Sequence, residues 1–218
     1  MSSTHESAYP VHHVGHHFNN ASDEFEAAKQ GMWVFLVTEI LMFGGLFVAY
    51  GIFRGMYPEM YVEAHHALQM KMGALNTIVL ITSSLTMALA VSATQRGKKQ
   101  RAIGMMAATI FLACCFLVVK YFEYSHKFHE GLLPGAFYSN TEITNPKAPL
   151  FFSLYFMMTG LHGIHVLIGI GLISWMILRS LRNEFSENFY TPVELVGFYW
   201  HFVDIVWIYL FPLLYLVS

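Results

Sequence analysis

Long apolar runs separated by short polar segments make up the chain after its first 29 residues. A helix needs about 20 mostly apolar residues to cross the hydrocarbon core of a bilayer. Five runs meet that length, and the helices expected from them cover residues 30–53, 71–93, 102–124, 150–178 and 192–217. The pattern therefore predicts an all-α polytopic membrane protein, in which residues 30–218 form a bundle of five transmembrane helices.

The first 29 residues are polar and contain the histidines His5, His12, His13, His16 and His17. They lack an apolar core, so no cleavable signal peptide is expected. Although His13 and His17 are spaced i, i+4, no cysteine or fixed scaffold accompanies them, and we expect no metal site here. Ser22 and the acidic residues after it are typical of a capped lead-in to the first helix.

Composition agrees with a membrane protein, since charged residues make up 12% of the chain, against ~25% in a soluble domain. The formal net charge of -2 and the lack of a basic tail give no indication of nucleic-acid binding. Cys114 and Cys115 are adjacent in an apolar run, so we interpret them as small buried hydrophobes rather than as disulfide or metal ligands.

Small residues and turn residues predict how the helices meet and where they stop. Gly44, Gly45 and Ala49 in the first helix, and Gly160, Gly163 and Gly169 in the fourth, are expected to allow close helix contacts. The segments between the first two helices and between the third and fourth are expected to be loops. The second of these is rich in turn residues, namely Gly131, Pro134, Gly135, Pro146 and Pro149.

Basic residues predict the orientation, because they gather in cytoplasmic segments. With a cytoplasmic N-terminus, the inner segments would hold Lys29, Arg96, Lys98, Lys99, Arg101, Arg179 and Arg182. The outer segments would hold Arg54, Lys71, Lys127 and Lys147. The dense cluster at 96–101 decides in favour of a cytoplasmic N-terminus and a periplasmic C-terminus.

The last helix carries His201 and Asp204 one turn apart near its middle. Ionisable groups at that depth are costly unless they face a protein interior, so this helix needs polar partners. We expect one hydrogen-bonded seam between the fourth and fifth helices, formed by His162, His165, Glu194, His201 and Asp204. In the third helix, Lys120 and Glu123 are spaced to pair with each other, although Lys120 alone would also reach the interface by snorkelling.

Glu39 lies about nine residues inside the first helix, roughly 14 Å from its cytoplasmic end. Desolvation there favours the neutral acid, so we expect a raised pKa. Its neighbours in the sequence, Thr38 and Ile40, offer no cation. The structural interpretation is a protonated carboxyl that hydrogen-bonds a neighbouring helix.

Several kinds of chemistry are compatible with these residues. His162 or His165 with His201, from different helices, could serve as axial haem ligands, although the Gly-rich strip around His162 and His165 suits close helix packing better. Copper would need further ligands at fixed spacing. A proton or ion relay through Glu39, Glu123, Glu194 and Asp204 would indicate a transporter. Structural histidines are the favoured interpretation, and these residues alone leave the role of the bundle open.

Longer motifs add a resemblance. They are Gly31-Met-Trp-Val-Phe-Leu-Val-Thr-Glu39, Leu75-Asn-Thr77, Lys120-Tyr-Phe-Glu-Tyr124, Thr159-Gly-Leu-His-Gly-Ile-His-Val166 and Phe198-Tyr-Trp-His-Phe-Val-Asp-Ile-Val-Trp207. From Phe18 to the C-terminus the chain resembles subunit III of haem–copper oxidases, in the short five-helix bacterial form that lacks the two leading helices of the mitochondrial form.

The resemblance implies a non-catalytic subunit without a redox centre or metal, in a multi-pass arrangement in the bacterial cytoplasmic membrane. Haems and copper would lie in partner subunits I and II, and cytochrome c would be the electron donor to an aa3-type complex. Glu39 would support the proton path, and Arg179 and Arg182 would contact phospholipid. The alternatives are subunit III of a quinol oxidase, a free-standing proton-coupled transporter and a di-haem membrane cytochrome.

Overall fold

The computed structural model describes residues 21–65, 68–134, 137–140, 143, 145–186 and 189–216. Its helices are α1 (Ala21–Met56), α2 (Pro58–His65), α3 (Met70–Gln95), α4 (Lys99–His129), α5 (Ala148–Leu181) and α6 (Thr191–Tyr215). All except α2 are long and apolar enough to cross a membrane, which confirms the predicted all-α bundle of five transmembrane helices. The five histidines of the N-terminal segment lie outside the described residues.

α1, α3, α4 and α5 extend beyond the apolar runs that predict them, whereas α6 ends at Tyr215, before the expected residue 217. α1 begins at Ala21, nine residues before the expected start, because Asp23 and Glu24 in its first turn favour a helix N-terminus. The segment after α1 was expected to be a loop, but Pro58 begins the short helix α2, in keeping with the preference for proline in a first turn. Length and hydropathy locate a span, whereas the helix ends depend on local capping residues.

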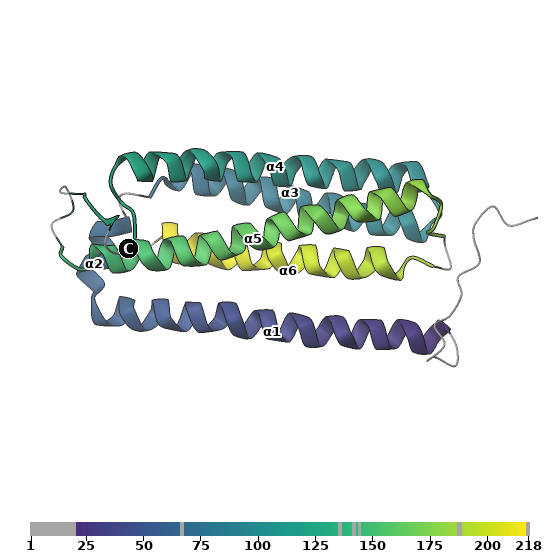
Figure 1. Ribbon diagram of the computed structural model, residues 1–218, viewed down its shortest axis with the longest axis horizontal. Helices are drawn as coiled ribbons and strands as arrows, with labels where there is room; N and C mark the ends of the chain where they lie inside the picture. Colours follow the sequence, from purple (N-terminus) through teal and green to yellow (C-terminus); the bar gives the residue numbers. More distant parts are fainter. Residues whose placement is uncertain are drawn as a thin grey trace, which may run out of the picture.

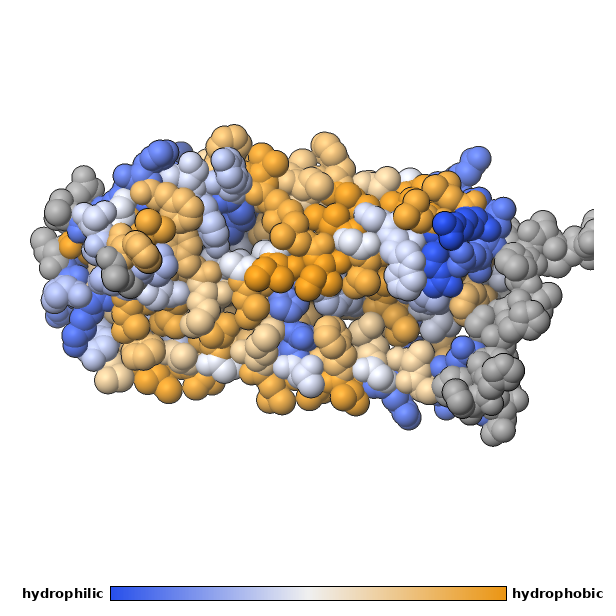
Figure 2. Space-filling view, in the orientation of Figure 1, coloured by the Kyte–Doolittle hydropathy of each residue, from blue (hydrophilic) through white to orange (hydrophobic). Residues whose placement is uncertain are grey.

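The long helices run alternately in opposite directions, and α1 lies at the edge of the group formed by the other four (Figure 1). We call the end with residues 96–101 and 182–190 the basic end, and the opposite end the α2 end. On the face drawn in Figure 2, an apolar band covers the middle of the molecule, with hydrophilic side chains at both ends. This surface suits a bilayer, in which lipid covers apolar side chains and the helix ends meet the headgroups.

At the α2 end, α1 is held by buried aromatic contacts. The Tyr50 ring lies perpendicular to that of Tyr61, with centroids 4.9 Å apart, and Tyr61 meets Phe151 in the same way at 5.2 Å. The Tyr50 hydroxyl donates to the Leu213 carbonyl of α6. Burial raises the pKa of the Tyr61 hydroxyl above its usual range, so this phenol stays protonated.

Of the five helix glycines named above, only Gly169 brings two helices into close contact. A Cβ on Gly169 would lie 2.6 Å from the Trp200 ring, so α5 and α6 approach each other at this glycine. Gly44, Gly45 and Gly163 have open space where a Cβ would be, and the expectation that they bring helices together is wrong. Glycine in a membrane helix leaves room for lipid or a partner subunit as readily as for a neighbouring helix.

Candidate functional site

A buried ion cluster joins α4, α5 and α6 near the α2 end. The Lys120 ammonium lies 2.9 Å from Glu123 Oε2, and the two side chains are 8% and 1% exposed. Lys120 also donates to the Tyr155 and Tyr215 hydroxyls, at 3.2 and 3.0 Å. The second carboxylate oxygen, Oε1, accepts from Tyr155 at 2.9 Å and from Tyr215 at 2.5 Å.

Both charges of this cluster are therefore compensated within the chain. A buried ion pair is tolerated only where further hydrogen bonds satisfy its remaining polar atoms, and the two tyrosines supply them. The Lys120 ammonium also lies 5.0 Å from the centre of the Trp207 ring. The pairing of Lys120 with Glu123 is confirmed, and Lys120 does not snorkel to the interface.

Glu39 and His165 form a second polar group, close to the middles of α1 and α5. His165 Nε2 lies 2.9 Å from Glu39 Oε2, and the His165 and Glu39 side chains are 10% and 15% exposed. A small hydrophilic patch interrupts the apolar band between α1 and the helices above it (Figure 2). Glu39 thus hydrogen-bonds a neighbouring helix as expected, and its partner is a histidine 126 residues further along the chain.

The contacts of His165 fix how protons are shared in this pair. Its Nδ1 lies 2.8 Å from the Leu161 carbonyl oxygen, which can only accept, so Nδ1 carries a hydrogen. The bond between Nε2 and Glu39 then requires one further proton, on the carboxyl or on Nε2. The pair therefore holds one exchangeable proton at mid-membrane depth.

A third group lies where α3 meets α6. His201 Nδ1 is 2.7 Å from the Ser84 hydroxyl, and both residues are partly exposed. Asp204, one turn along α6, is 2% exposed, and within the described residues neither of its carboxyl oxygens has a hydrogen-bond partner.

The expected single seam of histidines and carboxyls is wrong. His165 pairs with Glu39 and His201 with Ser84, while neither nitrogen of the buried His162 has a partner in the described part of the chain. The His162 ring packs against Phe116 and Trp207, at centroid distances of 5.5 and 5.2 Å. Glu194 lies at the basic end, 3.7 Å from Lys29. The five residues thus lie in four environments, with only His201 and Asp204 together, because their helices face different neighbours.

At the basic end, the two arginines predicted to contact lipid differ. Arg179 Nε donates to Glu184 Oε2 at 2.6 Å, and its guanidinium lies over the rings of Trp175 and Phe185. Arg182 is exposed, and no ion pair involves it among the described residues. Arg182 is therefore the freer of the two to contact a phosphate.

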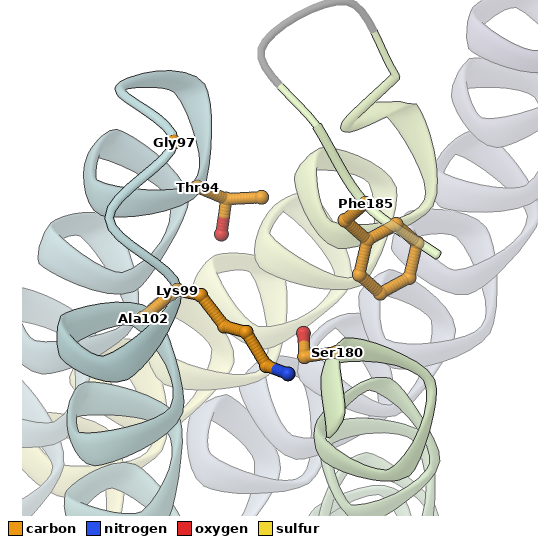
Figure 3. A pocket seen from close by; sticks show the side chains of 6 residues that line it. All are labelled: Thr94, Gly97, Lys99, Ala102, Ser180 and Phe185. Carbon is orange, nitrogen blue, oxygen red and sulfur yellow. The ribbon is translucent and has the colours of Figure 1, made fainter. Parts of the chain in front are cut away.

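A small pocket beside these arginines is too small for a lipid headgroup. It is lined by residues of α3, the turn after α3, α4, α5 and the segment after α5, namely Thr94, Gly97, Lys99, Ala102, Ser180 and Phe185 (Figure 3). Its volume of about 20 Å³ suits a single water molecule. Lys99 donates to the Leu181 carbonyl at 2.9 Å and to Asn183 Oδ1 at 2.6 Å. Its ammonium therefore caps the C-terminus of α5.

A larger groove of about 260 Å³ lies between α1 and α6. Its lining is almost wholly apolar and consists of Ile40, Phe43, Gly44, Phe47, Phe202, Ile205, Val206 and Tyr209. The missing side chain of Gly44 helps to keep it open. Such a lining suits hydrocarbon. No group of three or more potential metal ligands occurs among the residues that the structure describes.

Comparison with known proteins identifies the family. The family described as cytochrome c oxidase subunit III matches residues 8–218. The chain belongs to this family. "Cytochrome c oxidase subunit 3" of Thermostichus vulcanus is 34% identical over 189 residues, which cover 86% of each protein. "Cytochrome bo(3) ubiquinol oxidase subunit 3" of Pseudomonas putida is 26% identical over 90% of this chain and 88% of that protein.

A third relative, "Heme-copper oxidase subunit I+III" of Aeropyrum pernix, is 29% identical over 87% of this chain, which matches 22% of that longer protein. The resemblance stated from the motifs is thereby confirmed. The chain is a multi-pass membrane subunit of a haem–copper oxidase and associates with other oxidase subunits. Relatives named for cytochrome c and for quinol both occur, so the family alone does not define the electron donor.

Proposed function

We propose that the chain is the non-catalytic third subunit of an aa3-type cytochrome c oxidase in a bacterial cytoplasmic membrane. The observation that carries this proposal is the family match over residues 8–218. The higher identity to the Thermostichus protein, 34% against 26% for the Pseudomonas ubiquinol oxidase subunit, favours cytochrome c as the donor. Haems and copper belong to subunits I and II, and the Aeropyrum relative that joins I and III supports subunit I as the direct partner.

Purification of the tagged chain from its native membrane tests this proposal. We expect it to carry haem-bearing subunits with an a-type spectrum, and the complex to oxidise reduced cytochrome c in preference to quinol. Preferential oxidation of quinol would place the chain in the quinol oxidase branch. A chain that purifies alone would favour a free-standing proton-coupled transporter, and a Soret band in the isolated chain would favour a di-haem cytochrome.

The chain's contribution to the reaction is support for proton uptake by subunit I. The Glu39–His165 pair supplies the physical basis, because it holds one proton at mid-membrane depth and remains partly exposed. The proton can move between Glu39 and His165 without leaving an unpaired charge in the bilayer core, where such a charge is costly. Glu39 therefore supports the neighbouring proton path and is not a catalytic base.

The second contribution is phospholipid binding. The apolar groove between α1 and α6 accepts an acyl chain, and Arg182 at the basic end binds the anionic phosphate. Arg182→Gln should lower the phospholipid that copurifies with the complex. Arg179→Gln should have the smaller effect, since Arg179 is held by Glu184. Equal lipid content in wild type and Arg182→Gln would contradict this assignment.

The basic end faces the cytoplasm in this proposal. Four basic residues lie between positions 96 and 101. Lys127, one of the four basic residues counted for the other side, is buried and adds no surface charge there. A protease added to intact cells should leave the 96–101 segment uncut and cleave it in inverted membrane vesicles. Cleavage in intact cells would reverse the orientation.

A further inference from the structure

The surface where α3 meets α6 carries polar groups that the chain itself leaves incompletely paired. We define this α3–α6 face by Ile81, Ser84, Leu85, His201 and Ile208. Ser84 and His201 lie near the middles of their helices and are partly exposed. His201 Nδ1 contacts Ser84, while its Nε2 has no hydrogen bond among the described residues. The apolar residues of this face, Ile81, Leu85 and Ile208, are exposed.

The Lys120–Glu123 and Glu39–His165 groups differ in this respect. Lys120 and Glu123 are satisfied by two tyrosines, and Glu39 and His165 pair with each other. On the α3–α6 face, one ring nitrogen of His201 lacks such a partner in the described chain. Hydrocarbon offers neither donor nor acceptor, so lipid alone would leave this imidazole unsatisfied in the bilayer core.

We infer that the α3–α6 face binds a transmembrane helix of subunit I that presents a hydrogen-bonding side chain to His201 Nε2. This inference rests on the proposed function, which makes subunit I the partner. A helix is the appropriate occupant, because helices and closed barrels are the structures that span lipid with their own backbone groups satisfied. Polar side chains that bond across helices contribute to helix association in membranes. The exposed Ile81, Leu85 and Ile208 supply the apolar contact around that bond.

Site-specific photo-crosslinking in the intact membrane tests this face. A benzophenone amino acid replaces Leu85 on the α3–α6 face and, as a matched control, Leu167 on α5. Both leucines lie just past the middle of their helices and are 60% and 57% exposed, so depth and accessibility are alike. After irradiation, the tagged chain is purified under denaturing conditions and its adducts are identified by mass spectrometry.

The expected result is a covalent product with subunit I at position 85, at least fivefold more abundant than at position 167. A product with subunit I at position 167 but not at 85 would overturn the inference while leaving the proposed function intact. Adducts at position 85 with lipid only, or with a second copy of the chain, would overturn it in the same way. If the wild-type chain copurifies with no haem-bearing subunit, the proposed function fails, and this inference fails with it.

Discussion

Two polar groups lie within the membrane-spanning part of the same bundle, and their hydrogen bonding differs. Lys120 and Glu123 are enclosed by α4, α5 and α6, and tyrosines satisfy the polar atoms that their ion pair leaves over. Ser84 of α3 hydrogen-bonds His201 of α6 at the surface of the bundle, and the buried Asp204 nearby has no hydrogen-bond partner in the described chain. The first arrangement stabilises this chain alone, whereas the second needs a partner for completion. Polar residues in a membrane subunit can thus stabilise its own fold or its assembly with other subunits. Whether their hydrogen bonds are satisfied within the chain distinguishes the two roles.

The largest effect is expected at the ion cluster. Glu123→Leu leaves the Lys120 ammonium buried without its carboxylate, which should lower the free energy of unfolding by about 3–5 kcal/mol. The double variant Lys120→Met with Glu123→Leu should recover most of the loss, since no buried pair remains to be broken. Thermal unfolding of the detergent-solubilised chain measures both.

Glu130→Leu is the matched control for this prediction. Glu130 lies just beyond the same helix and pairs with His126 at 2.9 Å, with both side chains exposed. An exposed pair of this kind contributes about 0–1 kcal/mol. If Glu123→Leu were as mild as Glu130→Leu, the cluster would not be the internal anchor that its geometry indicates.

The Glu39–His165 pair is intermediate, because it is satisfied within the chain and yet partly exposed. Glu39→Ala should leave haem spectra and assembly of the oxidase unchanged, while activity declines sooner during sustained turnover. Glu26→Ala, an exposed carboxyl on the same helix, is the control and should match wild type. Immediate loss of all oxygen reduction in a fully assembled Glu39→Ala complex would instead place Glu39 on an obligatory proton path.

The smallest effect on the isolated chain is expected at Asp204. Its carboxyl oxygens accept no hydrogen bond in the described structure, so Asp204→Leu removes an uncompensated polar group. Stability should stay the same or rise by about 1 kcal/mol. A loss comparable with that of Glu123→Leu would mean that Asp204 has internal partners and that the two regions do not differ as described.

Sequence reasoning predicted the spans well because length and hydropathy determine them. It also predicted the Lys120–Glu123 pair, whose partners are one helical turn apart. Pro58, which favours the first turn of a helix, accounts for the start of α2. Nothing in the sequence indicated that Tyr155 and Tyr215 take part in this cluster, because aromatic residues are frequent throughout the chain. Their hydroxyls meet Glu123 only when α4, α5 and α6 pack together.

The polar seam was predicted wrongly for a physical reason. Helices that face lipid on one side and protein on the other are apolar all round, so periodicity does not reveal which face is buried. His162 and His165 share a helix and are three residues apart, yet His165 faces Glu39 of α1 whereas His162 packs against Phe116 and Trp207. Rotation of a membrane helix about its axis is set by neighbours, and here one of those neighbours is proposed to be another subunit.

The most direct test of the difference between the two regions measures His201→Phe twice, in the free chain and in the oxidase. Phenylalanine keeps the ring and removes both nitrogens. We expect the thermal stability of the solubilised full chain to change by less than about 1 kcal/mol. Retention of the chain by haem-bearing subunits should fall about three- to tenfold. His126→Phe, an exposed histidine outside the α3–α6 face, should change neither. Unchanged retention together with a destabilised chain would show that His201 supports the fold rather than the assembly, and would contradict the account.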